Sequence, residues 1–230
     1  SNLDEFFMIR VASLKDMVAV KYEKPDIAGM TPQEQLKALD QATHELVNMQ
    51  YSTYTRSILP LLEKNGLHVI QAHEDLSRTE GEYVDRYFKD NVYPVLTPMA
   101  VDSSRPFPLI RNKSLNIGAL VRKKGEGKEL EFATVQVPSV LPRIVEIPSK
   151  DGVRKVILLE EIIEKNMEKL FLSYDIVCAH PFRIMRNADL TIEEDEAADL
   201  LKEIEKQLKK RQWGQAIRLE VEAGIDKKLL

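Results

Sequence analysis

Apolar residues recur at helical spacing through the first third of the chain. A first stripe covers residues 3–18, and a longer one covers residues 36–62. Thr31 stands before Pro32 in the pattern of an N-cap followed by a proline at the first helical position, which predicts where the longer helix begins. The Asn-Gly pair at residues 65–66 predicts where it ends.

A third helix is predicted after Ser77, which forms the pattern of a capping box with Glu80. The helical pattern continues to Tyr87. Prolines then cluster at positions 94, 98, 106 and 108, and this cluster favours a domain boundary. We therefore expect an N-terminal helical domain over residues 1–91, truncated at its start.

The second part of the chain has the short alternating segments that are typical of strands. LNIGALVR and LEFATVQV flank the glycine-containing KKGEGKE, which predicts a β-hairpin. Further strands are predicted at RIVEIP, VRKVILL and AIRLEV, with a buried strand at YDIVCAHPFRI and helices over residues 159–170 and 193–211. The expected fold class is a multidomain α and α+β protein, in which an α+β middle domain with a mixed sheet covers residues 92–230.

Composition narrows the class of protein. The 230 residues carry a net charge of -4, which argues against a general nucleic-acid binder. Cys178 is the only cysteine, so an internal disulfide is excluded and a reducing, cytoplasmic setting is expected. We expect no transmembrane segment, although peripheral membrane association of the parent protein stays open. Because the chain opens in SNLDEFF, already helical in pattern, we interpret it as a fragment.

The sequence shows no catalytic centre of a known local pattern. GEGKE lacks the spacing of a phosphate-binding loop and is better explained as a hairpin tip. The four histidines (His44, His68, His73 and His180) have no metal-ligand spacing, and no metal site is expected.

Polar residues of three segments could bind nucleotide or polyanion. Asn2 is explained by an N-cap paired with Glu5, or by a carboxamide that reads the edge of an adenine. The proline-stiffened loop DSSRPFPLIRNKSLN carries Arg105, Arg111 and Lys113, which suit either a solvated loop or a phosphate-facing one.

The third segment is RIMRNADL, at the end of the predicted buried strand. We expect its two arginines, Arg183 and Arg186, to share one face of that strand. They could form salt bridges with nearby acids or a polyanion-binding face.

The same segments carry a family resemblance. NLDEFFMIRVASLKD, YPVLTPMAVDSSRPFPLIRNKSLNIG, VQVPSVLPRIVEIP, RIMRNADL and WGQAIRLEVEAG resemble successive blocks of class I polyphosphate kinase, in family order. The resemblance implies an enzyme that uses ATP and Mg²⁺ and reversibly transfers the terminal phosphate of ATP to inorganic polyphosphate. It implies a phosphohistidine intermediate downstream of this chain, so that no catalytic residue lies within it.

The resemblance also implies roles for the two parts of the chain. Asn2 matches the asparagine that the family's N-terminal domain contributes to the nucleotide site, and the middle (head) domain is associated with contacts of a homodimer or higher homo-oligomer. The family's first helix and the segment before NLDEF have no counterpart in this sequence, so we expect the fold around Asn2 to be incomplete. The competing hypothesis is a stand-alone, non-catalytic module that binds nucleotide or polyphosphate or serves in assembly.

Overall fold

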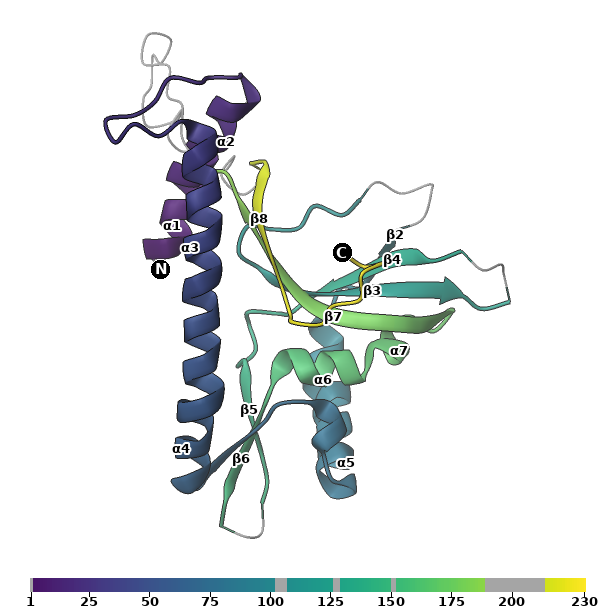
Figure 1. The fold of residues 1–230 in the computed structure, drawn as a ribbon. Coiled ribbons are helices and arrows are strands. Elements are labelled where there is room, and N and C mark those ends of the chain that lie inside the picture. Colours follow the sequence, from purple (N-terminus) through teal and green to yellow (C-terminus); the bar gives the residue numbers. More distant parts are fainter. Residues whose placement is uncertain (1, 102–106, 126–128, 150–151, 189–213) are drawn as a thin grey trace, which may run out of the picture. The chain divides into compact units, whose positions relative to one another are not determined.

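A computed structural model describes residues 2–101, 107–125, 129–149, 152–188 and 214–230 (Figure 1). The chain forms two compact units, each assembled from separate stretches of sequence. Compact unit 1 comprises Ser1–Tyr51, Leu109–Ser114 and Arg183–Glu220, and compact unit 2 comprises Ser52–Pro108, Leu115–Phe182 and Val221–Leu230. The boundary between residues 91 and 92, expected from the proline cluster, stays a prediction.

The first helical segment is continuous in sequence and begins compact unit 1. It consists of α1 (Asn2–Phe6), a π-helical turn (Phe7–Val11) and α2 (Ala12–Ala19). Its apolar stripe packs into a small core as expected from the spacing. The buried members of that core are Phe7, Met8, Val11, Ala12, Met185, Ala188 and Ile217.

The long helix has the predicted start and end. It consists of α3 (Pro32–Thr53), a π-helical turn (Tyr54–Ile58) and α4 (Leu59–Lys64). At its start, Glu34 Oε2 accepts a 2.8 Å hydrogen bond from the backbone N–H of Thr31, and the Glu34 N–H donates back to Thr31 Oγ1 at 3.3 Å. Gly66 follows its end with φ of 80°, the left-handed conformation that a helix stop requires. Residues 33–64 are all described and contain no strand.

The helical part ends earlier than expected, because Leu67–Ile70 forms strand β1. This strand pairs in parallel with β6 (Arg154–Leu158), which pairs antiparallel with β5 (Ile144–Ile147), in the order β1-β6-β5. Four residues are too few to reveal a period, and the partner of β1 lies more than eighty positions away in sequence. Helical structure then resumes in a 3₁₀ turn (His73–Asp75), α5 (Arg78–Tyr87), a π-helical turn (Phe88–Val92) and a 3₁₀ turn (Tyr93–Val95).

A five-stranded sheet follows the order β2-β4-β3-β7-β8 (Figure 1). Its strands are β2 (Met99–Val101), β3 (Leu115–Lys123), β4 (Glu131–Gln136), β7 (Tyr174–Arg186) and β8 (Ala216–Val221). The predicted hairpin is confirmed, since β3 and β4 pair antiparallel from Asn116↔Gln136 to Val121↔Glu131. The α+β class with mixed and antiparallel sheets is also confirmed.

Strand β7 is less buried than the sequence suggested. Of its thirteen residues only Met185 is fully buried, and Val177 is 43% exposed. The helix expected over residues 159–170 is broken at Asn166 into α6 (Leu159–Lys165) and α7 (Met167–Leu170). The helix expected over residues 193–211 lies outside the described residues.

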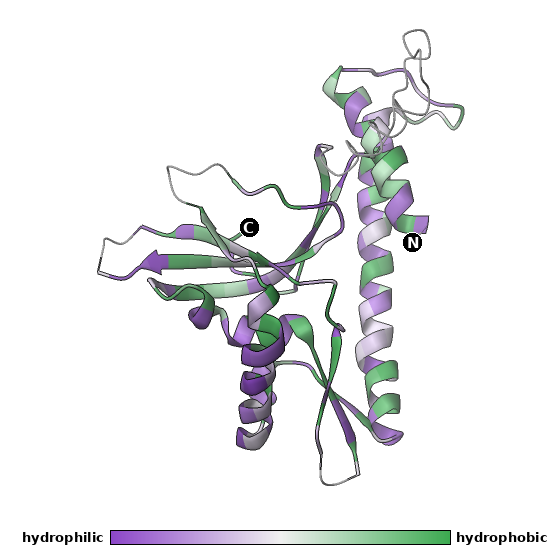
Figure 2. Cartoon of the chain, turned by 180° about the vertical axis from the view of Figure 1, so that it is seen from behind, coloured by the Kyte–Doolittle hydropathy of each residue, from purple (hydrophilic) through white to green (hydrophobic). Residues whose placement is uncertain are grey.

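The main core lies in compact unit 2, where α6 lies against one face of the sheet beside β3 (Figure 1). It is built from apolar residues of α5, the π-helical turn after it, α6 and the central strands, including Val84, Phe88, Ile117, Val135 and Ile162. By contrast, the long helix leaves large apolar side chains such as Leu46 and Met49 exposed, and its surface alternates between hydrophobic and hydrophilic residues (Figure 2).

Candidate functional site

Five of the six site residues predicted from the sequence fall within compact unit 1, although they come from three separate stretches of the chain. The first stretch supplies Asn2, the second Arg111 and Lys113, and the third Arg183 and Arg186. Arg105 lies outside the described residues. The small core of this unit joins the first and third stretches, and Arg186 joins the second stretch to the third by donating to the carbonyl oxygen of Ile110.

Asn2 is an exposed side chain in the first turn of α1. The helix that follows it is fixed by Phe7 and Met8, which are buried against residues of β7 and β8. The backbone N–H of Ala188 donates a 2.9 Å hydrogen bond to the carbonyl oxygen of Met8. These contacts hold the start of α1 beside the end of β7.

Asp4 connects α1 to both basic stretches. Its carboxylate lies 4.0 Å from Nζ of Lys113 and 4.0 Å from Nη2 of Arg183, and its side chain is only 16% exposed. Asp4 stands two residues after Asn2 on the same short helix. The structure therefore brings two cations of the predicted polyanion face to the short helix that carries the predicted nucleotide residue.

Arg183 also has a closer acidic partner. Its Nε donates a 2.6 Å hydrogen bond to Oε2 of Glu220 in β8, and Arg218 Nη2 lies 3.3 Å from Oε1 of the same carboxylate. Two interpretations were open for Arg183: salt bridges with nearby acids, or a polyanion-binding face. The contacts that the structure describes are ion pairs with acids. A phosphate at this position would compete with Glu220 for the guanidinium group.

Arg186 is used to join backbone segments. Its Nε donates to the carbonyl oxygen of Ile110 at 2.8 Å, and its Nη1 donates to that of Gly214 at 2.9 Å. Burial lowers the pKa of Arg186. Removing this side chain would break both hydrogen bonds, so its described role is structural.

The expectation that Arg183 and Arg186 share a face of the strand is wrong. They are three residues apart, and side chains in a strand alternate between faces with period two. Their partners differ accordingly: Arg183 meets a carboxylate of β8, whereas Arg186 meets the carbonyl groups of Ile110 and Gly214.

Arg111 and Lys113 lie on a tight turn. The Ser114 N–H and hydroxyl both donate to the carbonyl oxygen of Arg111, at 3.3 and 2.9 Å, and the Lys113 N–H donates to Ile184 O at 2.9 Å. Lys113 adopts φ of 61°, a left-handed conformation that sharply reverses the direction of the backbone in this turn. Both basic side chains are exposed. This turn therefore presents two cations to solvent from a fixed backbone.

Sequence reasoning missed several residues of this site. Asn112 joins two stretches, because its Oδ1 accepts from the Arg186 N–H at 3.0 Å and its Nδ2 lies 3.2 Å from Met8 Sδ. The Arg218 guanidinium lies 4.3 Å from the centroid of the Phe7 ring, a cation–π contact. Arg218 and Glu220 alternate within AIRLEV, which is the one local signal that they share a face.

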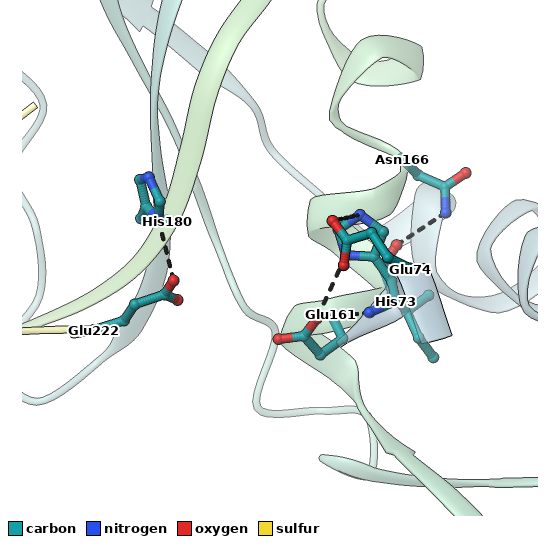
Figure 3. A network of polar contacts seen from close by, with 7 residues as sticks. His73, Glu74, Glu161, Asn166, His180 and Glu222 are labelled. Atoms are coloured by element: carbon teal, nitrogen blue, oxygen red, sulfur yellow. Dashed lines mark hydrogen bonds and ion pairs between the residues drawn. The ribbon is translucent and has the colours of Figure 1, made fainter. Parts of the chain in front are cut away.

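A second polar cluster lies in compact unit 2 (Figure 3). His73 Nδ1 lies 3.4 Å from Oε2 of Glu161, and His73 Nε2 lies 3.2 Å from Oε1 of Glu74. Near the end of the chain, His180 Nδ1 lies 3.2 Å from Oε1 of Glu222. We call these residues, together with Glu164, the histidine–carboxylate cluster.

Glu164 has the most strongly shifted pKa in this cluster. Burial, together with the negative charges of Glu161, Glu222 and Glu74, raises the pKa of Glu164 to about 8. Burial also raises the pKa of Glu161, against the opposing effect of His73. The native state therefore holds a proton on Glu164 that the unfolded chain releases near the ordinary value of 4.5.

This shift predicts a specific pH dependence of stability. Because the native pKa of Glu164 is raised, its contribution to stability is lost as pH rises from about 4.5 through about 8. Glu164→Gln should remove this loss and make the protein more stable than the original at pH 9, by on the order of 2 kcal/mol after allowance for partial exposure. Urea unfolding across pH 5–9 measures the effect.

The matched control is Glu168→Gln, which removes a carboxylate from an exposed position on the neighbouring α7. It should leave the shape of the stability curve unchanged. Parallel curves for the original protein and Glu164→Gln would mean that Glu164 is ionised in the native state at neutral pH.

The other two histidines lie on the surface of the long helix and just beyond it. His44 Nδ1 hydrogen-bonds the carbonyl oxygen of Asp40 at 2.9 Å, and His68 Nδ1 lies 3.3 Å from Glu63. Among the described ranges, no group of three or more histidine, cysteine or acidic side chains is placed to hold a metal ion. Nor does any helix in those ranges combine the length and apolarity needed to cross a membrane.

Family models match almost the whole chain. The model described as polyphosphate kinase N-terminal domain matches residues 1–70, and the model described as polyphosphate kinase middle domain matches residues 79–230.

Individual relatives agree with these models. The chain is 47% identical over 226 residues to a polyphosphate kinase of Halalkalibacterium halodurans, covering 98% of the chain and 32% of that protein. It is 48% identical over 227 residues to a polyphosphate kinase of Lactiplantibacillus plantarum, covering 99% of the chain and 31% of the relative. The chain thus spans about a third of the length of these relatives.

A solved structure has the same fold. The crystal structure of polyphosphate kinase from Porphyromonas gingivalis matches with a TM-score of 0.71 at 22% identity, over 92% of this chain and 33% of that one. At this identity the likeness establishes the architecture alone.

Proposed function

Because the chain belongs to the polyphosphate kinase family, we propose that it forms part of an enzyme that reversibly transfers the terminal phosphate of ATP to inorganic polyphosphate. Its own contribution is to bind the nucleotide, through Asn2, and to supply cations for the polyanion. The phosphohistidine belongs to a part of the enzyme outside this chain. Within the described ranges no three histidine, cysteine or acidic side chains gather to hold a metal ion, and the ligands of Mg²⁺ are proposed to lie mostly outside this chain.

The observation that carries the proposal is the arrangement around Asp4. Lys113 and Arg183 converge on this carboxylate from two different stretches, and Asn2 lies on the same helical turn. An amide offers a donor and an acceptor to a base, and ammonium or guanidinium groups bind phosphate oxygens. Carried by one compact unit, these groups suit the two ends of a nucleotide.

Asn2→Ala in the complete enzyme tests the nucleotide role. A lost hydrogen bond to a base weakens binding by about 0.5–1.5 kcal/mol, so the Michaelis constant for ATP should rise several-fold. The melting temperature should stay unchanged, since Asn2 is exposed and outside the small core. Initial rates against ATP concentration and a thermal melt measure both quantities.

Glu5→Ala is the control, because Glu5 is an exposed neighbour on the same short helix. It should leave the ATP dependence unaltered. If Asn2→Ala instead lowers the melting temperature and leaves the ATP curve as it was, Asn2 acts as a helix cap.

Arg111, Lys113 and Arg183 are proposed as polyphosphate contacts, together with Arg105. Arg111→Ala should weaken polyphosphate binding and flatten its salt dependence, because fewer counterions are released, by analogy with nucleic acid. Arg186→Ala should chiefly lower thermal stability, because it removes two hydrogen bonds to backbone carbonyl groups. Equal salt dependence in Arg111→Ala and the original enzyme would remove this residue from the polyphosphate site.

The proposal includes self-association through residues 92–230, as a homodimer or higher homo-oligomer. The alternative is a non-catalytic binding or assembly module, and the gene distinguishes it from the enzyme. A module of this kind requires a reading frame without the downstream histidine, and its product should form no polyphosphate from ATP.

A further inference from the structure

A hollow of about 490 Å³ opens in compact unit 2 where α5 gives way to the π-helical turn. Its volume is within the range of small-molecule sites. The residues that line it are Asp85, Arg86, Phe88, Lys89, Tyr93 and Lys169. None of them belongs to the group around Asp4, which lies in the other compact unit.

Cations dominate the charge of this hollow. Its one acid, Asp85, is already engaged by Lys165 Nζ at 2.7 Å and by Lys169 Nζ at 3.4 Å. Burial raises the pKa of Asp85, and these two lysines more than offset that effect, so the carboxyl stays ionised. It is thus shared between two cations while Arg86 and Lys89 stand exposed beside it.

The positions of Arg86 and Lys89 bring two like charges together. They are three residues apart in continuous helical structure, which makes them neighbours on the helix surface. Like charges that are neighbours on a helix surface repel each other and destabilise the helix. An anion bound between them and Lys169 would relieve that repulsion.

Two aromatic rings form the apolar part of the hollow. Phe88 is buried at its base, and Lys169 Nζ lies 5.9 Å from the centroid of its ring. The Tyr93 ring lies 6.0 Å from that of Phe88 at an interplanar angle of 65°, and Tyr93 is 51% exposed. Tyr93 therefore presents a ring to solvent at the edge of a cationic surface, the combination on which bases stack while their phosphates are bound.

We propose that this hollow binds a polyphosphorylated anion, with its phosphates on Arg86, Lys89 and Lys169. Two sources share this chemistry: a nucleoside triphosphate, whose base would stack on Tyr93, and an inorganic polyphosphate chain, which would leave Tyr93 unused. The proposal rests on the hollow alone and does not require Asn2 to read a base.

The experiment uses the complete protein and equilibrium dialysis without magnesium, with labelled ATP and labelled tripolyphosphate as separate probes. Arg86→Glu with Lys89→Glu should remove one equivalent of bound probe per chain, or weaken it at least tenfold. The control, Lys227→Glu with Lys228→Glu, makes the same charge change at exposed positions elsewhere in compact unit 2 and should change binding less than twofold. The Asn2→Ala variant should still bind the one equivalent of probe that the hollow takes up. A failure of the proposed nucleotide role of Asn2 can therefore be distinguished from a failure of the hollow.

Tyr93→Ala separates the two sources. Several-fold weaker binding of ATP with unchanged binding of tripolyphosphate identifies the nucleotide, and unchanged binding of both identifies the inorganic chain. If the variant with Arg86→Glu and Lys89→Glu does not fold, the variant with Arg86→Gln and Lys89→Gln takes its place. Equal numbers of sites and equal affinities in the hollow variants and the control would overturn the proposal.

Discussion

Residues 1–230, purified and incubated with labelled ATP and magnesium, are expected to acquire no acid-labile phosphate and to form no polyphosphate. Transfer through a protein intermediate needs an imidazole nitrogen with a free lone pair, held where cations meet the phosphates. None of the four histidines meets both conditions in the described contacts.

His73 is surrounded by acids. The carboxyl groups of Glu161 and Glu74 face its two ring nitrogens at 3.4 and 3.2 Å. In the described contacts, a phosphate that approached either nitrogen would meet an acidic side chain and no cation. His44 is a largely exposed side chain and His68 a partly exposed one, and each lies next to an acid, without the enclosed surroundings that orient a nucleophile.

His180 comes nearest to meeting the two conditions. If Nδ1 donates to Glu222, the second ring nitrogen keeps a lone pair, and its side chain is only 19% exposed. The charged group beside it is an acid, however: Glu222 Oε1 lies 3.2 Å from its Nδ1. Such surroundings repel the phosphates of ATP instead of stabilising the charge that develops in transfer.

The complete enzyme, labelled in parallel, is the positive control for this experiment. An acid-labile phosphate on the 230-residue chain that is lost in His180→Ala would place chemistry in the middle domain and contradict the proposed division of labour. His180→Ala in the complete enzyme should accordingly retain its phosphohistidine.

Features that depend on neighbouring residues could be predicted from the sequence. The capping box of Ser77 with Glu80 forms as expected, because it needs only a three-residue spacing. Thr31 caps the long helix as expected, and its reciprocal bonds with Glu34 complete a second box that was not predicted. The hairpin of β3 and β4 follows from alternation on either side of a glycine-containing turn. Strand β1 was missed because its stability comes from a partner distant in sequence.

In the candidate site, too, residue types could be predicted from the sequence, whereas contacts between distant stretches could not. Composition identified the basic residues, but it gave no information on which of them are already engaged. Arg186 binds two backbone carbonyl groups and Arg183 binds Glu220, and these partners lie 28 to 76 positions away along the chain. Asp4, which gathers Lys113 and Arg183, had no local signal because its importance arises only when three stretches fold into one unit.

Gly214→Ala is expected to destabilise compact unit 1 severely. A Cβ atom on Gly214 would lie 2.0 Å from the carbonyl oxygen of Asn187 and 3.0 Å from its carbonyl carbon. Both are backbone atoms, so the clash cannot be relieved by a rotamer change. The Asn187 N–H donates to Gln215 O at 2.8 Å, which fixes the two segments at this separation.

Relief of the clash requires the end of β7 and the approach to β8 to move apart. This movement costs about 1–3 kcal/mol as overpacking. It also displaces the carbonyl oxygen of Gly214 from Arg186 Nη1, and a hydrogen bond to a charged group is worth about 1.5–3 kcal/mol. Urea unfolding and hydrogen exchange of the Met8–Ala188 contact should both report the loss.

Gly81→Ala is the matched control, because it makes the same substitution inside α5, where a Cβ would meet no atom within 4 Å. It should stabilise the protein by about 0.5–1 kcal/mol, since alanine is the better helix former. Opposite signs for the two substitutions are the expected result.

Because Arg186 and Gly214 together hold the Arg111 turn and β8 in place, Gly214→Ala should also weaken polyphosphate binding, whereas Gly81→Ala should leave it intact. Unchanged stability in Gly214→Ala would mean that the two segments do not approach as closely as the described backbone has them.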